Sequence, residues 1–188
     1  MNDLRPVALT SAVMKICECM VLCKLEKLVK DYINPLQFAY RKNRSTDDAV
    51  LYSLENIYLH LEKTGSTGRL TFFNFSSAFN ILQPHLLVQK LLNMKLPSSV
   101  ISWIFDYLTS RLQDVRLNGL LSSAISTNTG APQGTVLAPF LFALYTADCR
   151  STDESCPLVK FADDTELVGN IRNDEDAIYH KQIENFVN

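Results

Sequence analysis

The sequence predicts an α+β fold in which helices pack on an antiparallel sheet. Several stretches repeat apolar residues at helical spacing, and two short apolar runs, 158–161 and 165–168, lie close enough together to form a hairpin. Strands and helices do not alternate regularly, as they would around a parallel sheet. The 188 residues, 47% of them hydrophobic, supply enough apolar side chains to bury a core.

Two helices and one strand are expected in the first part of the chain. Residues 11–28 repeat apolar side chains at helical spacing and predict an amphipathic helix. Ser45 is a good cap for a second amphipathic helix, because its hydroxyl precedes two acidic residues in the first turn. After a loop over 65–68, the aromatic-rich run 70–75 predicts a buried strand.

Proline and glycine mark the next elements. Pro84 suits the first position of a helix that reaches about residue 94, and Pro97 opens another helix. Between two short apolar runs, Asn118 and Gly119 form the pair that is favoured in a type I′ turn. A β-hairpin is therefore expected there.

The last part of the chain predicts a helix on each side of the strand pair. A polar loop over 127–134 leads into an apolar helix over 135–148. A final helix is expected to begin at Asp174 and to run to the end of the chain.

Composition limits the class of protein. The number of cysteines is odd and no Cys-x-x-Cys pair occurs, so buried or half-buried free thiols in a reducing compartment are expected rather than a zinc site. No apolar run approaches the ~20 residues that span a bilayer, and the first residues lack the layout of a signal peptide. An intracellular protein is expected, in the nucleus or the cytoplasm. The net charge of −2 counts against strong independent binding of nucleic acid.

Two acidic side chains, Asp163 and Asp164, stand at the expected connection between the last two strands. Carboxylates are preferred ligands of Mg²⁺, and phosphoryl transfer with two such ions needs two or three carboxylates close together. Taken alone, an Asp pair in a tight turn is more often only an exposed turn. Glu166 is expected to point elsewhere than Asp164.

Five segments, taken together, carry a resemblance. They are residues 4–15, residues 37–46 around Arg41, the aromatic segment 72–80 around Asn74, the loop 128–140 with Gly-Ala-Pro-Gln-Gly-Thr, and Phe-Ala-Asp-Asp at 161–164. In this order and at this spacing, the chain resembles the reverse transcriptase of non-long-terminal-repeat (LINE-type) retrotransposons. The resemblance implies the palm of a right-hand polymerase, an antiparallel sheet backed by helices, with part of the fingers and without the thumb. It further implies one domain over 1–188, with a fingers-derived part at 1–65 and the palm at 66–188, truncated at both ends.

The resemblance also implies residue roles. Asp163 is expected to bind metal, with Asp164 beside it, and the family has a third carboxylate where this chain has Asn74. The implied nucleotide-binding residues are Arg5, Arg41, Phe79, Gln133 and Gly134. Mg²⁺ or Mn²⁺ is the implied cofactor, and an RNA template, a DNA primer and dNTP are the implied partners. A membrane partner is not expected, and the oligomeric state stays open.

Asn74 is the main departure from the family pattern. Because an amide offers a neutral oxygen where the family has a charged carboxylate, metal binding is expected to be weakened and the copy to be inactive or very weak. Two alternatives stay open: an active RNA-directed DNA polymerase that uses Asp163 and Asp164, and a non-enzymatic remnant that binds RNA or a protein. Each nucleotide-binding residue also has a structural alternative: Phe79 as core, the arginines as surface charges, and Gln133-Gly134 as a plain turn.

Overall fold

The computed structural model describes residues 7–75 and 77–187. The chain groups into two compact units, each built from two stretches of sequence. Of the described residues, 7–32 and 77–145 form what we call the helical unit, and 33–75 and 146–187 form the sheet unit. Both helices and an antiparallel sheet are present, as the α+β prediction requires. The predicted border between fingers and palm at residue 65 does not coincide with these units and stays a prediction.

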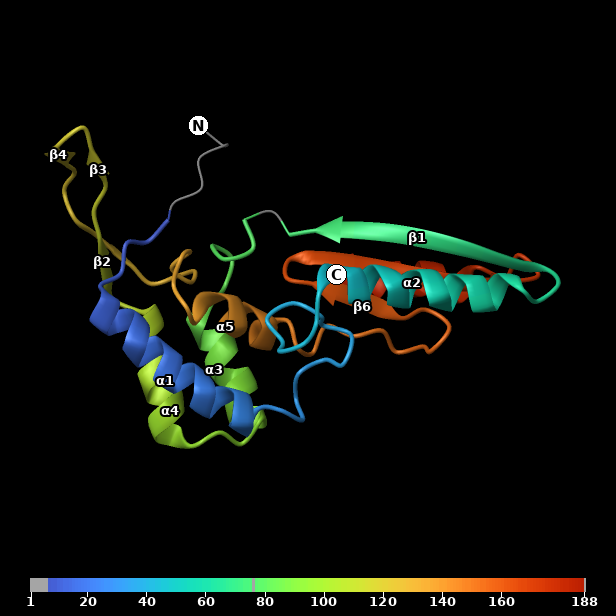
Figure 1. The fold of residues 1–188 in the computed structure, drawn as a ribbon, viewed down its shortest axis with the longest axis horizontal. Helices are drawn as coiled ribbons and strands as arrows, with labels where there is room; N and C mark the ends of the chain where they lie inside the picture. Colours follow the sequence, from blue (N-terminus) through green and yellow to red (C-terminus); the bar gives the residue numbers. More distant parts are fainter. Residues whose placement is uncertain (1–6, 76, 188) are drawn as a thin grey trace. The chain divides into compact units, whose positions relative to one another are not determined.

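The sheet unit contains three antiparallel strands in the order β1-β7-β6. Its elements are α2 (Thr46–Leu61), β1 (Ser66–Asn74), β6 (Leu158–Phe161), β7 (Asp164–Arg172) and α6 (Ala177–Val187). β1 and β7 pair over their full lengths, from Ser66 opposite Arg172 to Asn74 opposite Asp164. Figure 1 shows α2 running along this sheet.

The two faces of the sheet are covered by different helices. Val159 and Val168 pack with Ala49 of α2, whereas Leu158 and Leu167 pack with α6, where Tyr179 is buried. Neighbouring residues on a strand point to opposite faces, which explains why adjacent positions belong to different clusters. β6 and β7 are therefore apolar on both faces and lie between α2 and α6. β1 has no buried residue and Phe72 is 73% exposed, so the prediction of a buried strand over 70–75 was wrong about burial.

The helical unit is built around buried leucines. Its elements are α1 (Ala12–Leu28), α3 (Pro84–Asn93), α4 (Ser98–Leu108), β2 (Arg111–Gln113), β3 (Arg116–Leu117), β4 (Leu120–Leu121), β5 (Ile125–Thr127) and α5 (Ala138–Tyr145). α3 packs against α4 and α5. The predicted hairpin is present between β3 and β4, where Asn118 and Gly119 have φ angles of 49° and 82°. In Figure 1 this hairpin projects away from the helices of its unit.

Helical periodicity identified α1 and α2 but not the side chains that they bury. The apolar residues Val13, Ile16 and Met20 of α1 are 62–72% exposed, whereas Glu18 and Leu25 are fully buried. α2 likewise packs through Ala49 and Ser53, and most of its large apolar residues are exposed. Small side chains let α2 approach the sheet closely, and periodicity alone does not distinguish such a face from a leucine-rich one.

Some boundaries differ from the prediction. β1 begins at Ser66, so most of the expected loop over 65–68 is strand. The last helix begins at Ala177 rather than Asp174, because Asn173 and Asp174 have left-handed φ angles of 53° and 58° that no α-helix accommodates. The helix expected over 135–148 is limited to the residues of α5.

The cysteines and the membrane prediction can also be compared with the structure. All five cysteines are free, and Cys17, Cys19 and Cys23 on α1 are exposed rather than buried as expected. In the part of the chain that the structure describes, we find no helix with the length and apolarity that crossing a membrane requires.

Candidate active site

The three predicted metal-site positions lie at one end of the sheet. Asn74 is the last residue of β1 and stands directly opposite Asp164, the first residue of β7. Asp164 is also the partner of Phe161 on β6, so Asp163 lies in the short turn that joins the two strands. Side chains of directly opposed residues share one face and have Cβ atoms about 4.5–5.5 Å apart. Residues distant in sequence are thus brought together by strand register.

The turn that carries Asp163 has an unusual backbone conformation. Only Ala162 and Asp163 separate the paired residues Phe161 and Asp164. Ala162 has a φ angle of 59°, in the left-handed region, where a β-carbon costs about 1–2 kcal/mol. Such a conformation persists only when the surrounding structure supports it.

Support for this turn comes from Gln37, a residue for which the sequence predicted no role of its own. The buried Gln37 amide makes hydrogen bonds with both the N–H and the carbonyl of Ala162. From the same segment, Tyr40 lies close enough for the Asp163 charge to act on it: burial and, after it, this charge raise the pKa of the Tyr40 hydroxyl. The only sequence signal was that both residues belong to the segment 37–46.

Glu166 does not behave as expected. Residues two positions apart on a strand point to the same side, so Glu166 shares the face of Asp164, and the expectation that it points elsewhere was wrong. Its carboxylate accepts a hydrogen bond from the Ser53 hydroxyl of α2 at 3.0 Å. Burial raises the pKa of Glu166, and the Ser53 hydrogen bond opposes that shift. Glu166 is therefore occupied in the contact between α2 and the sheet.

The donor set at the end of the sheet is poorer than a three-carboxylate site. Asn74 and Asp164 are exposed and Asp163 is half-buried, so all three oxygen-bearing groups are accessible from solvent. Within residues 7–75 and 77–187, no group of three or more His, Cys, Asp or Glu side chains is placed to hold a metal ion. Two carboxylates and one amide oxygen are hard ligands of the type that Mg²⁺ accepts, but they carry one negative charge fewer than three carboxylates.

Three predicted nucleotide-binding residues lie in the helical unit. Phe79 is half-buried, and its ring packs against Phe142 of α5 at a centroid distance of 5.6 Å. The Ala131 N–H donates to the Phe79 carbonyl at 2.7 Å, which ties the loop before α5 to this aromatic residue. Gly130 has a φ angle of 73°, and an added β-carbon would lie 3.0 Å from the same carbonyl, so only glycine fits there.

Gln133 and Gly134 lie further along the same loop. The Gln133 carbonyl accepts a hydrogen bond from the Ala8 N–H at 2.7 Å. Gly134 has a φ angle of 87°, and a β-carbon there would lie 2.8 Å from a Val7 methyl carbon. Val7 and Ala8, from the segment 4–15, are therefore in direct contact with the loop 128–140 inside the helical unit.

The structure describes one of the two predicted arginines, Arg41. Arg5 lies outside the described residues. Arg41, in the sheet unit, donates through Nη1 to the carbonyls of Asn34, Pro35 and Gln37, at 3.0 Å for the shortest of these contacts. Its guanidinium thus supports the segment that holds the Asp163 turn, and its contact with a triphosphate stays a prediction.

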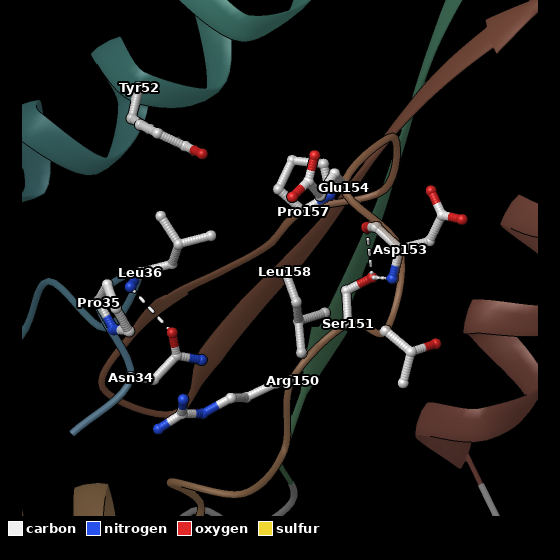
Figure 2. A pocket seen from close by; sticks show the side chains of 11 residues that line it. Asn34, Pro35, Leu36, Tyr52, Arg150, Ser151, Asp153, Glu154, Pro157 and Leu158 are labelled. Atoms are coloured by element: carbon white, nitrogen blue, oxygen red, sulfur yellow. Dashed lines mark hydrogen bonds between the residues drawn. The ribbon is translucent and has the colours of Figure 1, made fainter. Parts of the chain in front are cut away.

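A separate pocket opens elsewhere on the sheet unit. Its volume is about 480 Å³, and it is lined by the segment 34–36, by Tyr52 of α2 and by the segment that precedes β6. Figure 2 shows the Arg150 side chain extending toward Asn34, whose own side chain accepts a hydrogen bond from the Leu36 N–H. None of the predicted site residues lines this pocket, so it is distinct from the acidic end of the sheet.

An antiparallel sheet backed by helices, with Asp163 and Asp164 at the connection between β6 and β7, is typical of the palm of nucleic-acid polymerases. The chain belongs to the family Reverse transcriptase (RNA-dependent DNA polymerase), whose model matches residues 1–188. It is similar to a Drosophila melanogaster protein named "Probable RNA-directed DNA polymerase from transposon X-element", with 27% identity over 179 residues, or 92% of this chain and 20% of that protein. The RNA-directed DNA polymerase from the mobile element jockey, of the same organism, is 25% identical over 89% of this chain and 19% of its own length. The predicted retrotransposon type is thereby confirmed.

Solved structures of telomerase share the fold. The apo telomerase of Candida tropicalis, truncated from its C-terminal domain, has a TM-score of 0.63 at 13% identity, over 93% of this chain and 36% of that one. The telomerase of Candida albicans, in complex with a fragment of telomeric RNA, has a TM-score of 0.61 at 17% identity, over 92% of this chain and 32% of that one. At such identities the likeness is one of fold. The chain spans about a fifth of the length of the two transposon proteins.

Proposed function

We propose that this chain is an RNA-directed DNA polymerase domain in which catalysis is impaired or lost at Asn74. One observation carries the proposal: Asn74 is paired with Asp164, beside the turn of Asp163, where the family has a third carboxylate. Residues 1–65 would contribute to the fingers and residues 66–188 would form the palm. The names of the transposon relatives, and the RNA in one telomerase complex, support an RNA template as the partner.

The residues at the end of the sheet suit a weakened metal site. Reverse transcriptases normally use divalent metal, and Asp163 and Asp164 would hold Mg²⁺ or Mn²⁺ here. When bound, the ions would neutralise the charge that builds up on the phosphates during transfer. Asn74 can offer its amide oxygen but no negative charge. The loss of one such ligand costs about 3–5 kcal/mol of transition-state stabilisation, which corresponds to about 10²–10⁴-fold in rate.

The residues of the helical unit would select and orient the nucleotide. Gln133 and Gly134 would position the incoming dNTP against the template base, in a loop whose shape depends on glycine at 130 and 134. Phe79 would place its ring beneath the sugar and disfavour a 2′-hydroxyl. Arg41 and Arg5 would approach the triphosphate, for which a planar guanidinium is suited. A DNA primer would supply the attacking 3′-oxygen.

Primer extension on an RNA template tests the proposal. The unmodified chain and the Asn74→Asp variant are compared with Mg²⁺ and with Mn²⁺, and the double variant Asn74→Asp, Asp163→Asn serves as the control with two carboxylates. We expect Asn74→Asp to extend the primer at least about 10²-fold faster than the unmodified chain. The control should lose this gain, because it again has two carboxylates, at positions 74 and 164, instead of three.

The other outcomes separate the alternatives. Equal extension by the unmodified chain and by Asn74→Asp would show that Asp163 and Asp164 suffice, which makes this copy an active polymerase. If neither chain extends the primer but both bind the RNA template in a filter assay, the non-enzymatic alternative is favoured. Absence of both activities from folded protein would contradict the proposed function.

A further inference from the structure

The side chain of Gln37 makes an arrangement of hydrogen bonds that the proposed chemistry does not by itself require. Gln37 is 2% exposed. Its Oε1 accepts hydrogen bonds from the N–H groups of Ala162, at 3.2 Å, and of Ala39, at 3.1 Å. Its Nε2 donates to the carbonyl of Ala162 at 3.4 Å. One buried amide thus binds both backbone polar groups of a single turn residue.

That turn residue is the neighbour of Asp163. Ala162 lies in the connection between β6 and β7, outside the strand ladder that ends at the pair Phe161 and Asp164. Its left-handed φ angle of 59° is disfavoured for an alanine and needs support from other groups. Hydrogen bonds from outside the hairpin provide such support, because they fix the peptide groups on both sides of the Ala162 α-carbon.

Gln37 is itself held firmly. Gln37 pairs with Lys160 in a parallel bridge. In this bridge the Phe38 N–H donates to the Lys160 carbonyl and the Lys160 N–H donates to the Leu36 carbonyl, both at 2.8 Å. Gln37 therefore holds the turn from a segment that is hydrogen-bonded to β6 at Lys160, two residues before Ala162. Distance and orientation between the amide and the turn are fixed by this short path.

We propose that Gln37 is a positioning residue that fixes the Ala162–Asp163 turn and so directs the Asp163 carboxylate toward the side chain at position 74. This inference rests on the proposed function, in which Asp163 binds metal. Removal of a partner that orients a metal ligand typically lowers metal affinity about 10–100-fold. The same range is expected here.

The chain offers a matched control for this role. Gln182 on α6 is also a buried glutamine of the sheet unit, at 6% exposure, and its amide binds the N–H and hydroxyl of Thr152 and the hydroxyl of Ser151. Neither of these partners belongs to the Asp163 turn. Gln37→Met and Gln182→Met delete the same chemical groups, so a general loss of stability should affect both variants.

The test uses the full chain with Asn74→Asp as the parent, because a third carboxylate strengthens the metal signal. Mn²⁺ affinity is measured by electron paramagnetic resonance, and hydrogen exchange of the Ala162 amide is measured by NMR without metal. Gln37→Met should bind Mn²⁺ about 10–100-fold more weakly and exchange the Ala162 amide at least about tenfold faster. Gln182→Met should leave both unchanged.

A conservative variant guards against misfolding. Gln37→Glu matches the shape of the side chain and keeps an oxygen that accepts from the Ala162 and Ala39 N–H groups, but it loses the donor to the Ala162 carbonyl and adds a negative charge. Because that charge attracts Mn²⁺ by itself, only the exchange of the Ala162 amide is compared for this variant. Gln37→Glu should retain the protection that Gln37→Met loses, which would support positioning through hydrogen bonds rather than through side-chain volume.

Two results would overturn the inference, and one bears on the proposed function instead. Equal Mn²⁺ affinities for Gln37→Met, Gln182→Met and the parent would show that Gln37 is only structural. Unchanged exchange at Ala162 in Gln37→Met would show that the amide does not hold the turn. If the parent binds no Mn²⁺, the proposed metal site fails, and the exchange of Ala162 then decides alone whether Gln37 fixes the turn.

Discussion

Asn74 lacks the negative charge of the aspartate that the family has at this position. Because residue 74 stands opposite Asp164 on the paired strand, a charge restored there would face the Asp164 carboxylate. Like charges directly opposite in a sheet destabilise it, by about 0.2–1 kcal/mol on the scale of cross-strand pairs. We therefore expect Asn74→Asp to melt at a lower temperature than the unmodified chain without metal, and to gain more stability from Mn²⁺. Melting curves with and without Mn²⁺ measure both effects.

Asn80→Asp is the control for that prediction. Asn80 is exposed in the helical unit and is not part of the sheet register. This variant adds the same charge, so its response to Mn²⁺ should match that of the unmodified chain. An identical metal response in Asn74→Asp and Asn80→Asp would contradict the three-carboxylate geometry.

Glu166 should make stability depend on pH. Burial raises its pKa above the ordinary value of 4.5, so the folded state holds the proton more tightly than the unfolded state does. The free energy of unfolding must then fall as pH rises from about 4.5 through the folded pKa. Glu166→Gln keeps an acceptor for Ser53 and should remove this decline, which makes it the more stable protein at neutral pH. Urea unfolding across this range, with the exposed Glu184→Gln as control, checks the expectation; equal slopes would refute it.

Gly134 should tolerate alanine less well than Gly119 does. Both have left-handed φ angles, so each substitution costs about 1–2 kcal/mol in backbone strain. At Gly119 an added β-carbon meets nothing within 4 Å, whereas at Gly134 it lies 2.8 Å from a Val7 carbon and 3.3 Å from the Ala8 carbonyl oxygen. Gly134→Ala should therefore have the lower urea midpoint of the two variants. Equal midpoints would mean that the Val7 segment moves away without cost.

At the scale of elements, the start of α5 depends on a residue of α1. Glu18 is fully buried, and its Oε2 accepts hydrogen bonds from the N–H groups of Val136, at 2.6 Å, and Leu137, at 3.1 Å. These groups precede the first residue of α5, where backbone N–H donors lack helical partners. Tyr107 adds to this cluster by donating its hydroxyl hydrogen to Thr135, and burial raises the pKa of Tyr107 to about 12.

Glu18→Ala should destabilise the protein by about 1–3 kcal/mol, because it leaves the part-buried N–H of Val136 and the buried N–H of Leu137 without an acceptor. Glu18→Gln retains an acceptor oxygen and should lose less. Glu26→Ala, which deletes an exposed side chain on the same helix, should stay within about 0.5 kcal/mol of the unmodified chain. Chemical denaturation of the three variants measures the order, and a loss in Glu26→Ala equal to that in Glu18→Ala would refute the capping role.

At the scale of the whole molecule, net charge limits the affinity for nucleic acid. The chain has 18 basic and 20 acidic residues, so the long-range attraction on which non-specific binding depends is weak. We expect a Kd of about 10⁻⁵ M or weaker for an RNA–DNA hybrid at physiological salt, and further weakening as salt is raised. Fluorescence anisotropy over a salt series gives both values. A Kd below about 10⁻⁷ M, or one insensitive to salt, would contradict this expectation.

Family, fold class and most elements could be predicted from the sequence, because they depend on residues that are neighbours along the chain. The Ser45 cap is an example, since both of its reciprocal hydrogen bonds with Asp48 are formed within one helical turn. The Asn118-Gly119 hairpin is another, because two left-handed φ angles are favoured by just these two residues. The motifs that identify the family likewise lie in short, contiguous segments.

Other features were decided only by the tertiary structure, because they join segments that lie far apart in the chain. The pairing of Asn74 with Asp164 is set by strand register. The hydrogen bonds between Gln37 and Ala162 depend on the packing of the Gln37 segment against β6. Periodicity could not show that α1 exposes Val13 while burying Glu18, since burial depends on which neighbour covers each face. The sequence by itself thus determined the class of protein and its missing carboxylate, whereas long-range packing determined what surrounds and orients the carboxylates that remain.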